Sequence, residues 1–307
     1  NKVWNAARFV LRSLDGAPQP IPRIERAHLG LAERWILSRL DACIGEVTGE
    51  IDAYHFNVAA MSLYQFIWHE FCDWYIELAK EPLKAGGERQ AAARWVLVEC
   101  FDKLLRLLHG FMPFLTEEIW QTMRPYIGEP QLAAHLPIAK YPEVSKVAWL
   151  SSEEAAAMDH CIEATEAINS LRALLGHHPG QKVRAVIRRS LSDFSKWASY
   201  AATLAKLDAI SDQVPATGQV VFSHLAFADV GVEAPDGFDF EVARQKIRKQ
   251  LDEVGKHAKQ HRARLDDERF MAKADPETVT EVQQKFESLQ GQQGLLSEQL
   301  KQLEAAQ

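Results

Sequence analysis

The first half of the chain, residues 1 to about 142, has the hydrophobic period of amphipathic helices. Apolar residues recur at spacings of three and four over long stretches, and turn-forming sequences interrupt them at residues 17–23, 52–55 and 84–88 and after Met123. The rows are Ala32, Ile36, Arg39 and Leu40; Leu63, Ile67, Phe71, Trp74 and Leu78; and Trp95, Val98, Phe101, Leu104, Leu105 and Leu108. Long helices with one apolar stripe each, joined by short links, predict an antiparallel helical bundle.

The middle of the chain, residues 143–237, has a mixed pattern. It predicts a helix from Ser151 or Ser152 to about residue 175, because a serine N-cap is followed by acidic residues in the first turn. A strand over 182–187, a helix over 194–207 and a strand or hairpin over 219–230 follow. This segment therefore reads as a small α/β connector.

The last segment, residues 238–307, has apolar residues in alternating steps of three and four, which is typical of a coiled coil. The first row is Ile247, Leu251, Val254, Ala258, His261 and Leu265, and the second is Val279, Val282, Phe286, Leu289, Gln293, Leu296, Leu300 and Leu303. Asp275 and Pro276 form an N-cap and first-position pair for the second helix. We expect a projecting antiparallel coiled-coil hairpin with helices of about 40 Å, in a mainly α chain of three parts.

The composition of the 307 residues is that of ordinary globular domains, with 47% hydrophobic and 25% charged residues. The chain begins without an initiator Met or a signal-peptide pattern and has no apolar run long enough to span a bilayer, so we expect a soluble piece of a longer protein. With a net charge of −7, the protein as a whole does not attract polyanions, so any nucleic-acid contact requires local basic faces. The four cysteines are far apart and predict buried free thiols in a reducing compartment.

Catalytic motifs are missing from the sequence. HEFCD (69–73) has Asp73 where a zinc-protease helix needs its second histidine, and GHHPGQKV (176–183) lacks the end of a phosphate-binding loop. His257 and His261 could share a metal on one helix face, but no third ligand is evident. We expect neither a catalytic nor a metal site in this chain, and no cofactor.

The first helix separates two kinds of residue. Val3, Trp4, Ala7, Val10, Leu11 and Leu14 form an apolar arc, and Lys2, Asn5, Arg8, Phe9 and Arg12 occupy the opposite arc. An outward aromatic ring beside amide and cationic groups suits the stacking of an unpaired RNA base. The alternative is that Phe9 packs under a neighbouring helix and the charges are simply solvated, and the spacing leaves both open.

The first helix of the coiled coil has a second basic face. Its members are Arg248, Lys249, Lys256 and Arg262, with Lys259 and Arg264 at its edges, whereas the second helix is more acidic. Such a stripe could lie along a nucleic-acid backbone, or it could be the solvated exterior of a coiled coil.

Five motifs together give the chain a family resemblance. NKVWNAARFVL, AERWILSRLD, IWHEFCDWYIELAK, LRLLHGFMPFLTEEIW and ERFMAKADPETV occur in this order and resemble the C-terminal part of bacterial-type valyl-tRNA synthetases. The resemblance implies a helical anticodon-binding domain of the class I synthetase type over 1–142, a small α/β connector over 143–237, and a coiled-coil arm over 238–307 that contacts the outer corner of the tRNA.

The resemblance also implies roles for individual residues. Lys2, Asn5, Arg8 and Phe9 match the positions with which the family contacts the anticodon. For the tRNA corner, Arg262 or Arg264 are the best candidates, with Lys256 and Lys259 beside them.

The parent protein implied by the resemblance is a valine-tRNA ligase, with ATP and Mg used by catalytic and editing domains upstream of residue 1. The expected partners are tRNA(Val) and that upstream catalytic domain, in a cytoplasmic monomer without membrane attachment. Two alternatives stay open: the same region of another class I synthetase, of the isoleucyl type, and a coiled-coil adaptor that binds a protein.

Overall fold

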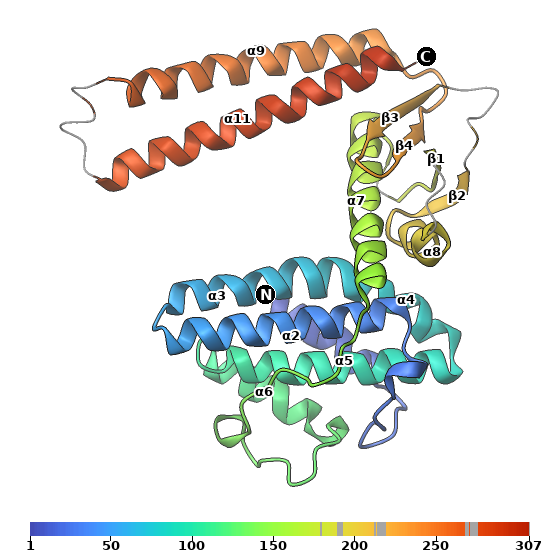
Figure 1. The fold of residues 1–307 in the computed structure, drawn as a ribbon, viewed down its shortest axis with the longest axis vertical. Coiled ribbons are helices and arrows are strands. Elements are labelled where there is room, and N and C mark those ends of the chain that lie inside the picture. The colour runs from blue at the N-terminus through green and yellow to red at the C-terminus, as the bar shows by residue number, and fades with distance from the viewer. Residues whose placement is uncertain are drawn as a thin grey trace. The chain divides into compact units, whose positions relative to one another are not determined.

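The computed structural model describes residues 1–178, 180–188, 193–211, 213, 219–267, 270 and 276–306 (Figure 1). These residues form two compact units. Unit 1 contains Asn1–Ile162 and Asp193–Leu204, and unit 2 contains Glu163–Ser192 and Ala205–Gln307. The helix α7 (Ser152–Leu174) contributes residues to both units. The three-part division expected from the sequence stays a prediction.

Unit 1 is mainly a bundle of helices, as the hydrophobic pattern predicts (Figure 1). Its helices are α1 (Lys2–Ser13), α2 (Leu31–Asp52), α3 (Phe56–Gln65), η2 (Phe66–Tyr75), α4 (Ile76–Ala85), α5 (Gly87–Leu108) and α6 (Pro113–Met123), with short 3₁₀ turns η1 (Arg26–His28), η3 (Arg124–Tyr126) and η4 (Leu136–Ile138). The helix α8 (Phe194–Leu204) also belongs to this unit and packs against α4. Gly86 and Gly87 both have positive φ, which lets the chain turn sharply between α4 and α5.

The predicted apolar rows form the core of this bundle, with two exceptions. Arg39 is exposed and pairs with Glu70, so the buried members of its row are Ala32, Ile36 and Leu40. Trp74 is half-buried and Tyr75 is fully buried in its place. The reason is that residues 66–75 form a π-helix, in which i→i+5 hydrogen bonds move the inward-facing positions away from the 3.6-residue period.

The cysteines lie within the helices as free thiols. Cys43, Cys100 and Cys161 are buried and Cys72 is half-buried. Burial raises the pKa of Cys43 to about 12 and that of Cys72 to about 11. The thiols of Cys43 and Cys72 are therefore protonated and unreactive at neutral pH.

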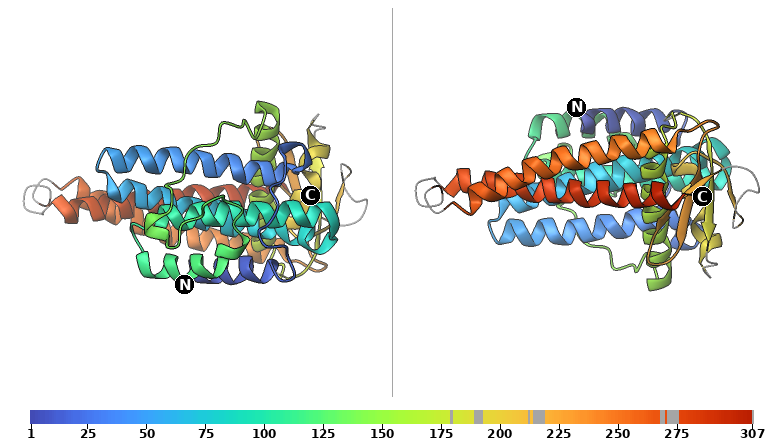
Figure 2. Two further views of the ribbon diagram at one scale, coloured as in Figure 1. Left: turned by 90° about the horizontal axis from the view of Figure 1, so that it is seen from below. Right: turned by 90° about the horizontal axis from the view of Figure 1, so that it is seen from above.

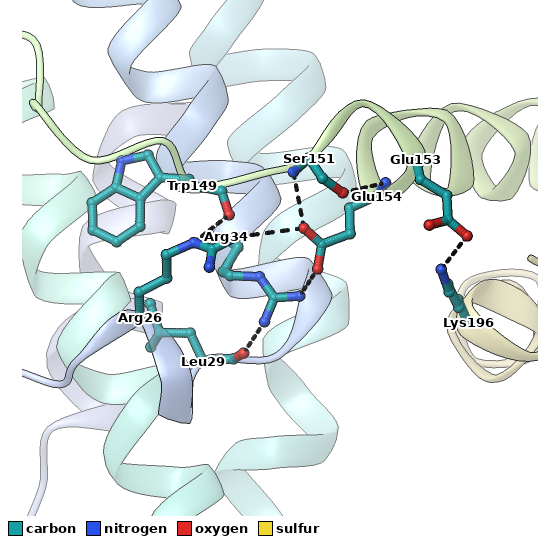
Figure 3. Close-up of polar contacts among 8 residues, drawn as sticks. All are labelled: Arg26, Leu29, Arg34, Trp149, Ser151, Glu153, Glu154 and Lys196. Atoms are coloured by element: carbon teal, nitrogen blue, oxygen red, sulfur yellow. Dashed lines mark hydrogen bonds and ion pairs between the residues drawn. The ribbon is translucent and has the colours of Figure 1, made fainter.

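The predicted N-cap of α7 is present in unit 1 (Figure 3). The backbone N–H of Glu154 donates to Oγ of Ser151 at 3.2 Å, and the backbone N–H of Ser151 donates to the Glu154 carboxylate at 2.9 Å. This reciprocal pair is a capping box. The Glu154 carboxylate also accepts from Arg34 and pairs with Arg26 at 3.6 Å, which ties the start of α7 to α2 and to the loop before it.

Unit 2 contains a four-stranded mixed sheet in the order β2-β1-β4-β3. The strands are β1 (Val183–Arg188), β2 (Leu207–Ser211), β3 (Val220–His224) and β4 (Asp229–Glu233), with β1 and β2 parallel and the other pairs antiparallel. Gly231 is needed in β4 because a Cβ there would lie 2.6 Å from side-chain atoms of Phe222 and Val220. The predicted strand over 182–187 and the hairpin over 219–230 are confirmed.

The helix predicted over 194–207 is too long. It ends at Leu204, Lys206 has a left-handed φ of 52°, and Leu207 begins β2, which the sequence pattern did not predict. Pairing of β2 with β1 supplies the backbone hydrogen bonds that a longer helix would otherwise provide.

The coiled-coil hairpin is formed by α9 (Phe240–Leu265) and α11 (Pro276–Ala305), which lie side by side in both views of Figure 2. The predicted heptad residues of both helices are buried or half-buried. Phe286, Leu289 and Ala258 form the centre of the contact, with Val254 and Leu265 packed against them. The helix α11 begins at Pro276 as predicted, and Asp275 lies outside the described residues.

Candidate nucleic-acid interface

The helix α1 is attached to the bundle through a narrow stripe of small apolar residues. Val3, Ala6, Ala7 and Val10 are buried, and the helix contacts α5, α6 and η2. In Figure 2, α1 and α6 lie along the same side of the bundle. Small alanines permit close approach of neighbouring helices, so a large part of the helix circumference is left uncovered.

Trp4 is not part of the core, contrary to the sequence prediction. Trp4 is 45% exposed, and Leu11 on the same side is only half-buried. At about 100° per residue, Trp4 lies roughly 100° from the centre of the buried stripe, which the two alanines make narrower than the sequence suggested. Trp4 is thus an exposed aromatic ring that sequence reasoning missed, although the run of Ala6 and Ala7 could have indicated a narrow stripe.

The outer face of α1 is polar and cationic. Asn5, Arg8 and Arg12 are exposed, and neither arginine forms an ion pair with the described part of the chain. Phe9 lies at the border of this face and is half-buried. The sequence predicts a fully outward ring, whereas the structure places Phe9 partly in the interior and partly in contact with solvent. Asn5, Arg8 and Phe9 therefore share one accessible side of a single helix.

Lys2 is placed differently from the other three predicted residues. Its Nζ donates to Oδ1 of Asp73 at 2.7 Å and to the backbone carbonyl of Trp68 at 3.2 Å, and it lies 5.1 Å from the centroid of the Trp68 ring. Its ammonium group is thus bound within unit 1 by the π-helix η2.

The end of α3 and the π-helix together bring aromatic rings to this region. Tyr64 stacks on Trp68 with ring centroids 4.5 Å apart, and His69 approaches the edge of Tyr64 at 6.2 Å. Nδ1 of His69 lies 3.6 Å from Oδ2 of Asp73. The sequence pattern places this HEFCD segment in an apolar helical row but does not predict its contact with α1.

The other end of α1 is fixed by Arg94 of α5. Its Nε donates to the carbonyl of Ser13 at 2.8 Å and its Nη2 to that of Asp15 at 2.8 Å. A cation at the C-terminal end satisfies free carbonyls and interacts favourably with the helix dipole. Both ends of the candidate recognition helix are therefore tethered to the bundle by charged side chains.

The four residues predicted on the arm are all exposed on α9. Arg262 is already engaged, because its Nε pairs with Asp266 at 3.0 Å and its guanidinium lies 5.7 Å from the Phe286 ring. The guanidinium carbon of Arg264 lies 5.0 Å from the centroid of the Phe270 ring. Lys256 and Lys259 form no ion pair with the described residues, so they are the most available cations of this set.

The described residues contain no group of three His, Cys, Asp or Glu side chains placed to hold a metal ion. Among the helices that the structure describes, none combines the length and apolarity that crossing a membrane requires.

Two family models match the chain. The model described as the anticodon-binding domain of tRNA ligase matches residues 33–187, and the model described as the valyl tRNA synthetase tRNA binding arm matches residues 239–304. The first covers the greater part of the helical bundle, and the second covers α9 and α11.

Curated relatives match almost the whole chain. The valine–tRNA ligase of Synechocystis sp. is 35% identical over 99% of this chain and 34% of its own length. Those of Pseudothermotoga lettingae and Geobacter sulfurreducens are 33% and 32% identical over 97% and 93% of the chain. The chain spans about a third of the length of these relatives and matches their C-terminal part. It therefore belongs to the family of tRNA ligases with this anticodon-binding domain, and within that family to the C-terminal region of the valine–tRNA ligases.

Proposed function

We propose that this chain is the tRNA-recognition part of a valine–tRNA ligase. The helical bundle of unit 1 binds the anticodon of tRNA(Val), and the α9–α11 arm contacts the outer corner of the same tRNA. The observation that supports this most strongly is the match of two RNA-related family models, in order, to the bundle and to the arm.

The outer face of α1 supplies the chemistry for anticodon binding. The guanidinium of Arg8 and the amide of Asn5 can hydrogen-bond base edges or the nearby backbone, and the ring of Phe9 can stack an unpaired base. A rigid helix tethered at both ends presents these groups without a large ordering cost.

The arm adds a second contact that depends on charge. The lysines of α9 can pair with backbone phosphates, which are the main source of sequence-independent affinity. Two modest contacts on one rigid RNA raise the total affinity through effective concentration.

The remaining functions belong to the parent protein. We assign valine activation with ATP and Mg, and any editing, to domains that precede this region, and expect no cofactor in this chain. The upstream catalytic domain of the same polypeptide is its second partner. We place the protein in the cytoplasm, as a monomer.

A filter-binding comparison tests this function. The full-length protein should retain a tRNA(Val) transcript at lower concentrations than an isoleucine tRNA transcript, and heparin should compete with both. Removal of the arm after Gly237 should weaken tRNA(Val) binding and make it less dependent on salt. Equal retention of all transcripts, with an unchanged salt dependence after arm removal, would instead favour a protein-binding coiled coil.

A further inference from the structure

The helix α3 and the start of η2 have an uncharged surface. Residues 56–68 contain no charged side chain and no histidine, yet Val58, Met61 and Tyr64 are exposed. Exposed apolar side chains that lie close together mark contact surfaces more often than isolated ones do. This stretch therefore has the composition of a binding surface.

The ring of Tyr64 is the exposed end of an aromatic stack. Its centroid lies 4.5 Å from that of Trp68, with the two ring planes 21° apart, and Nζ of Lys2 lies 5.1 Å from the Trp68 centroid. Tyr64 is nevertheless 43% exposed, whereas Trp68 is half-buried. Since Trp68 covers one face of the Tyr64 ring, the exposed area belongs mainly to the opposite face and the edge. One further flat ring can extend the Tyr64–Trp68 stack on that face.

The stack lies on the side of unit 1 to which α1 turns its predicted recognition residues. Lys2 and Phe9 are seven residues apart and therefore point in directions only about 20° apart, with Asn5 about 60° from Lys2. The contact of Lys2 with the Trp68 carbonyl, at 3.2 Å, places this side of α1 against η2. The Tyr64–Trp68 stack thus continues the accessible side of α1 onto a second helix.

The polar groups beside the stack suit an RNA base better than an apolar protein segment. The Lys2 ammonium uses two of its three donors on Asp73 and the Trp68 carbonyl, which leaves one for a base edge or a phosphate. The side chain of His69 is 54% exposed, and its ring centroid lies 6.2 Å from that of Tyr64 with the planes 73° apart. Its nitrogens can hydrogen-bond the edge of a base. An apolar partner would bury these polar groups without replacing their bonds to water.

We propose that Tyr64 is a second stacking platform, which binds an unpaired base of the tRNA anticodon loop on the face of its ring opposite Trp68. This inference rests on the proposed function and extends it, because the loop then contacts aromatic rings on two helices, Phe9 of α1 and Tyr64 of α3. It agrees with the RNA contact that the family resemblance implies for Lys2, since Lys2 lies beside the same Trp68 ring.

Substitutions of Tyr64 separate stacking from packing. Tyr64→Leu keeps an apolar side chain on Trp68 but removes the aromatic ring, so it should weaken binding of tRNA(Val) about 5- to 150-fold, the range for loss of one stacked base. Tyr64→Phe keeps the ring and should bind like the unaltered protein. The salt dependence should stay the same for both, because stacking neutralises no phosphate. Melting temperatures within a few degrees of the unaltered protein show that folding is retained.

Phe56→Ala is the matched control. Phe56 is 53% exposed and begins the same helix, about 12 Å before Tyr64 along the helix axis. Its ring contacts Tyr54 rather than the stack. Loss of this ring should leave the dissociation constant for tRNA(Val) unchanged. Equal weakening by Phe56→Ala and Tyr64→Leu would show a general effect of apolar surface and would overturn the stacking role.

The deciding experiment combines these variants with altered RNA. It measures dissociation constants of the full-length protein for tRNA(Val) and for ligated tRNA(Val) molecules in which each anticodon-loop nucleotide in turn is abasic. At one position, loss of the base should weaken binding by the unaltered protein and by Tyr64→Phe, but should cause no further loss in Tyr64→Leu. Full affinity of Tyr64→Leu, or the absence of such a position, would overturn stacking on Tyr64.

The same measurements show whether the proposed function fails separately. If Phe9→Leu is coupled to one loop position and Tyr64→Leu to none, anticodon binding by α1 holds, and the exposed face of α3 is left for a protein partner. If no abasic position weakens binding by the unaltered protein, both the proposed function and the second platform are contradicted.

Discussion

The indole nitrogen of Trp120 donates a hydrogen bond of 2.7 Å to the carboxylate of Asp102, and both side chains are buried in unit 1. The same carboxylate accepts from Nε of Arg106 at 3.0 Å, and Arg106 also binds Glu129. Burial raises the pKa of Asp102 despite the opposing effect of Arg106 and Trp120. The network joins α5 to α6 and to the loop that follows α6.

Asp102→Ala should destabilise the protein by roughly 3 kcal/mol, because it leaves the indole N–H without a partner and a buried guanidinium with reduced compensation. Urea unfolding followed by circular dichroism measures this loss. Glu143→Ala is the control, since that exposed carboxylate pairs at the surface with Lys140 and its loss should leave the urea unfolding transition nearly unchanged. Similar losses for the two variants would contradict the structural role of the buried network.

The stability of unit 1 should depend on pH through Glu154. The backbone N–H of Ser151, followed by Arg34 and Arg26, lowers the pKa of this carboxyl below its ordinary value of 4.5. A lowered folded-state pKa means that ionised Glu154 stabilises the native state above about pH 4.5, and that this contribution is lost as the pH falls through the lower value.

The measurement is the free energy of unfolding between pH 7 and pH 3.5 for the unaltered protein and for Glu154→Gln. The difference between them should be largest at neutral pH and should shrink on acidification. Glu118→Gln, at an exposed position of α6, should follow the unaltered protein throughout. A difference that is independent of pH would argue against the charge of Glu154 as the source.

The cations of the arm should contribute unequally to RNA binding. Lys256 and Lys259 are unpaired within the described residues, whereas Arg262 already pairs with Asp266. The double substitution Lys256→Ala with Lys259→Ala should therefore lower the salt slope of tRNA(Val) binding by about two. Arg262→Gln should lower it by less than one, and the reverse ranking would show that Arg262 leaves Asp266 when RNA binds.

Phe9→Ala should weaken tRNA(Val) binding by about 1–3 kcal/mol, which is the usual magnitude for loss of a stacked base. Since Phe9 is half-buried, part of any effect could come from packing. Phe9→Leu preserves bulk and apolar burial but removes the aromatic ring, so it should bind as weakly as the alanine variant while unfolding like the unaltered protein. Full affinity in Phe9→Leu would exclude stacking by this ring.

The parts of the fold with a strong local period were predictable from the sequence. The heptad rows of α9 and α11 place Ala258 and Phe286 in contact because a 3.5-residue repeat can bury only a partner helix. The Ser151–Glu154 capping box is likewise a short-range signal.

The features that were missed depend on contacts between distant segments. The π-helix at 66–75 and the burial of Tyr75 arise from packing among several helices, and β2 forms through its pairing with β1. The exposure of Trp4 depends on how closely α1 approaches its neighbours, which a helical wheel does not contain. The partners of Lys2 are 66 and 71 residues away in sequence.

We infer that this region recognises the anticodon of a valine tRNA. The most direct measurement compares the dissociation constants of the full-length protein for a tRNA(Val) transcript and for the same transcript with its anticodon replaced. We predict that the replacement weakens binding about tenfold or more, equivalent to one lost stacked and hydrogen-bonded base. Equal affinity for the two transcripts would contradict the account.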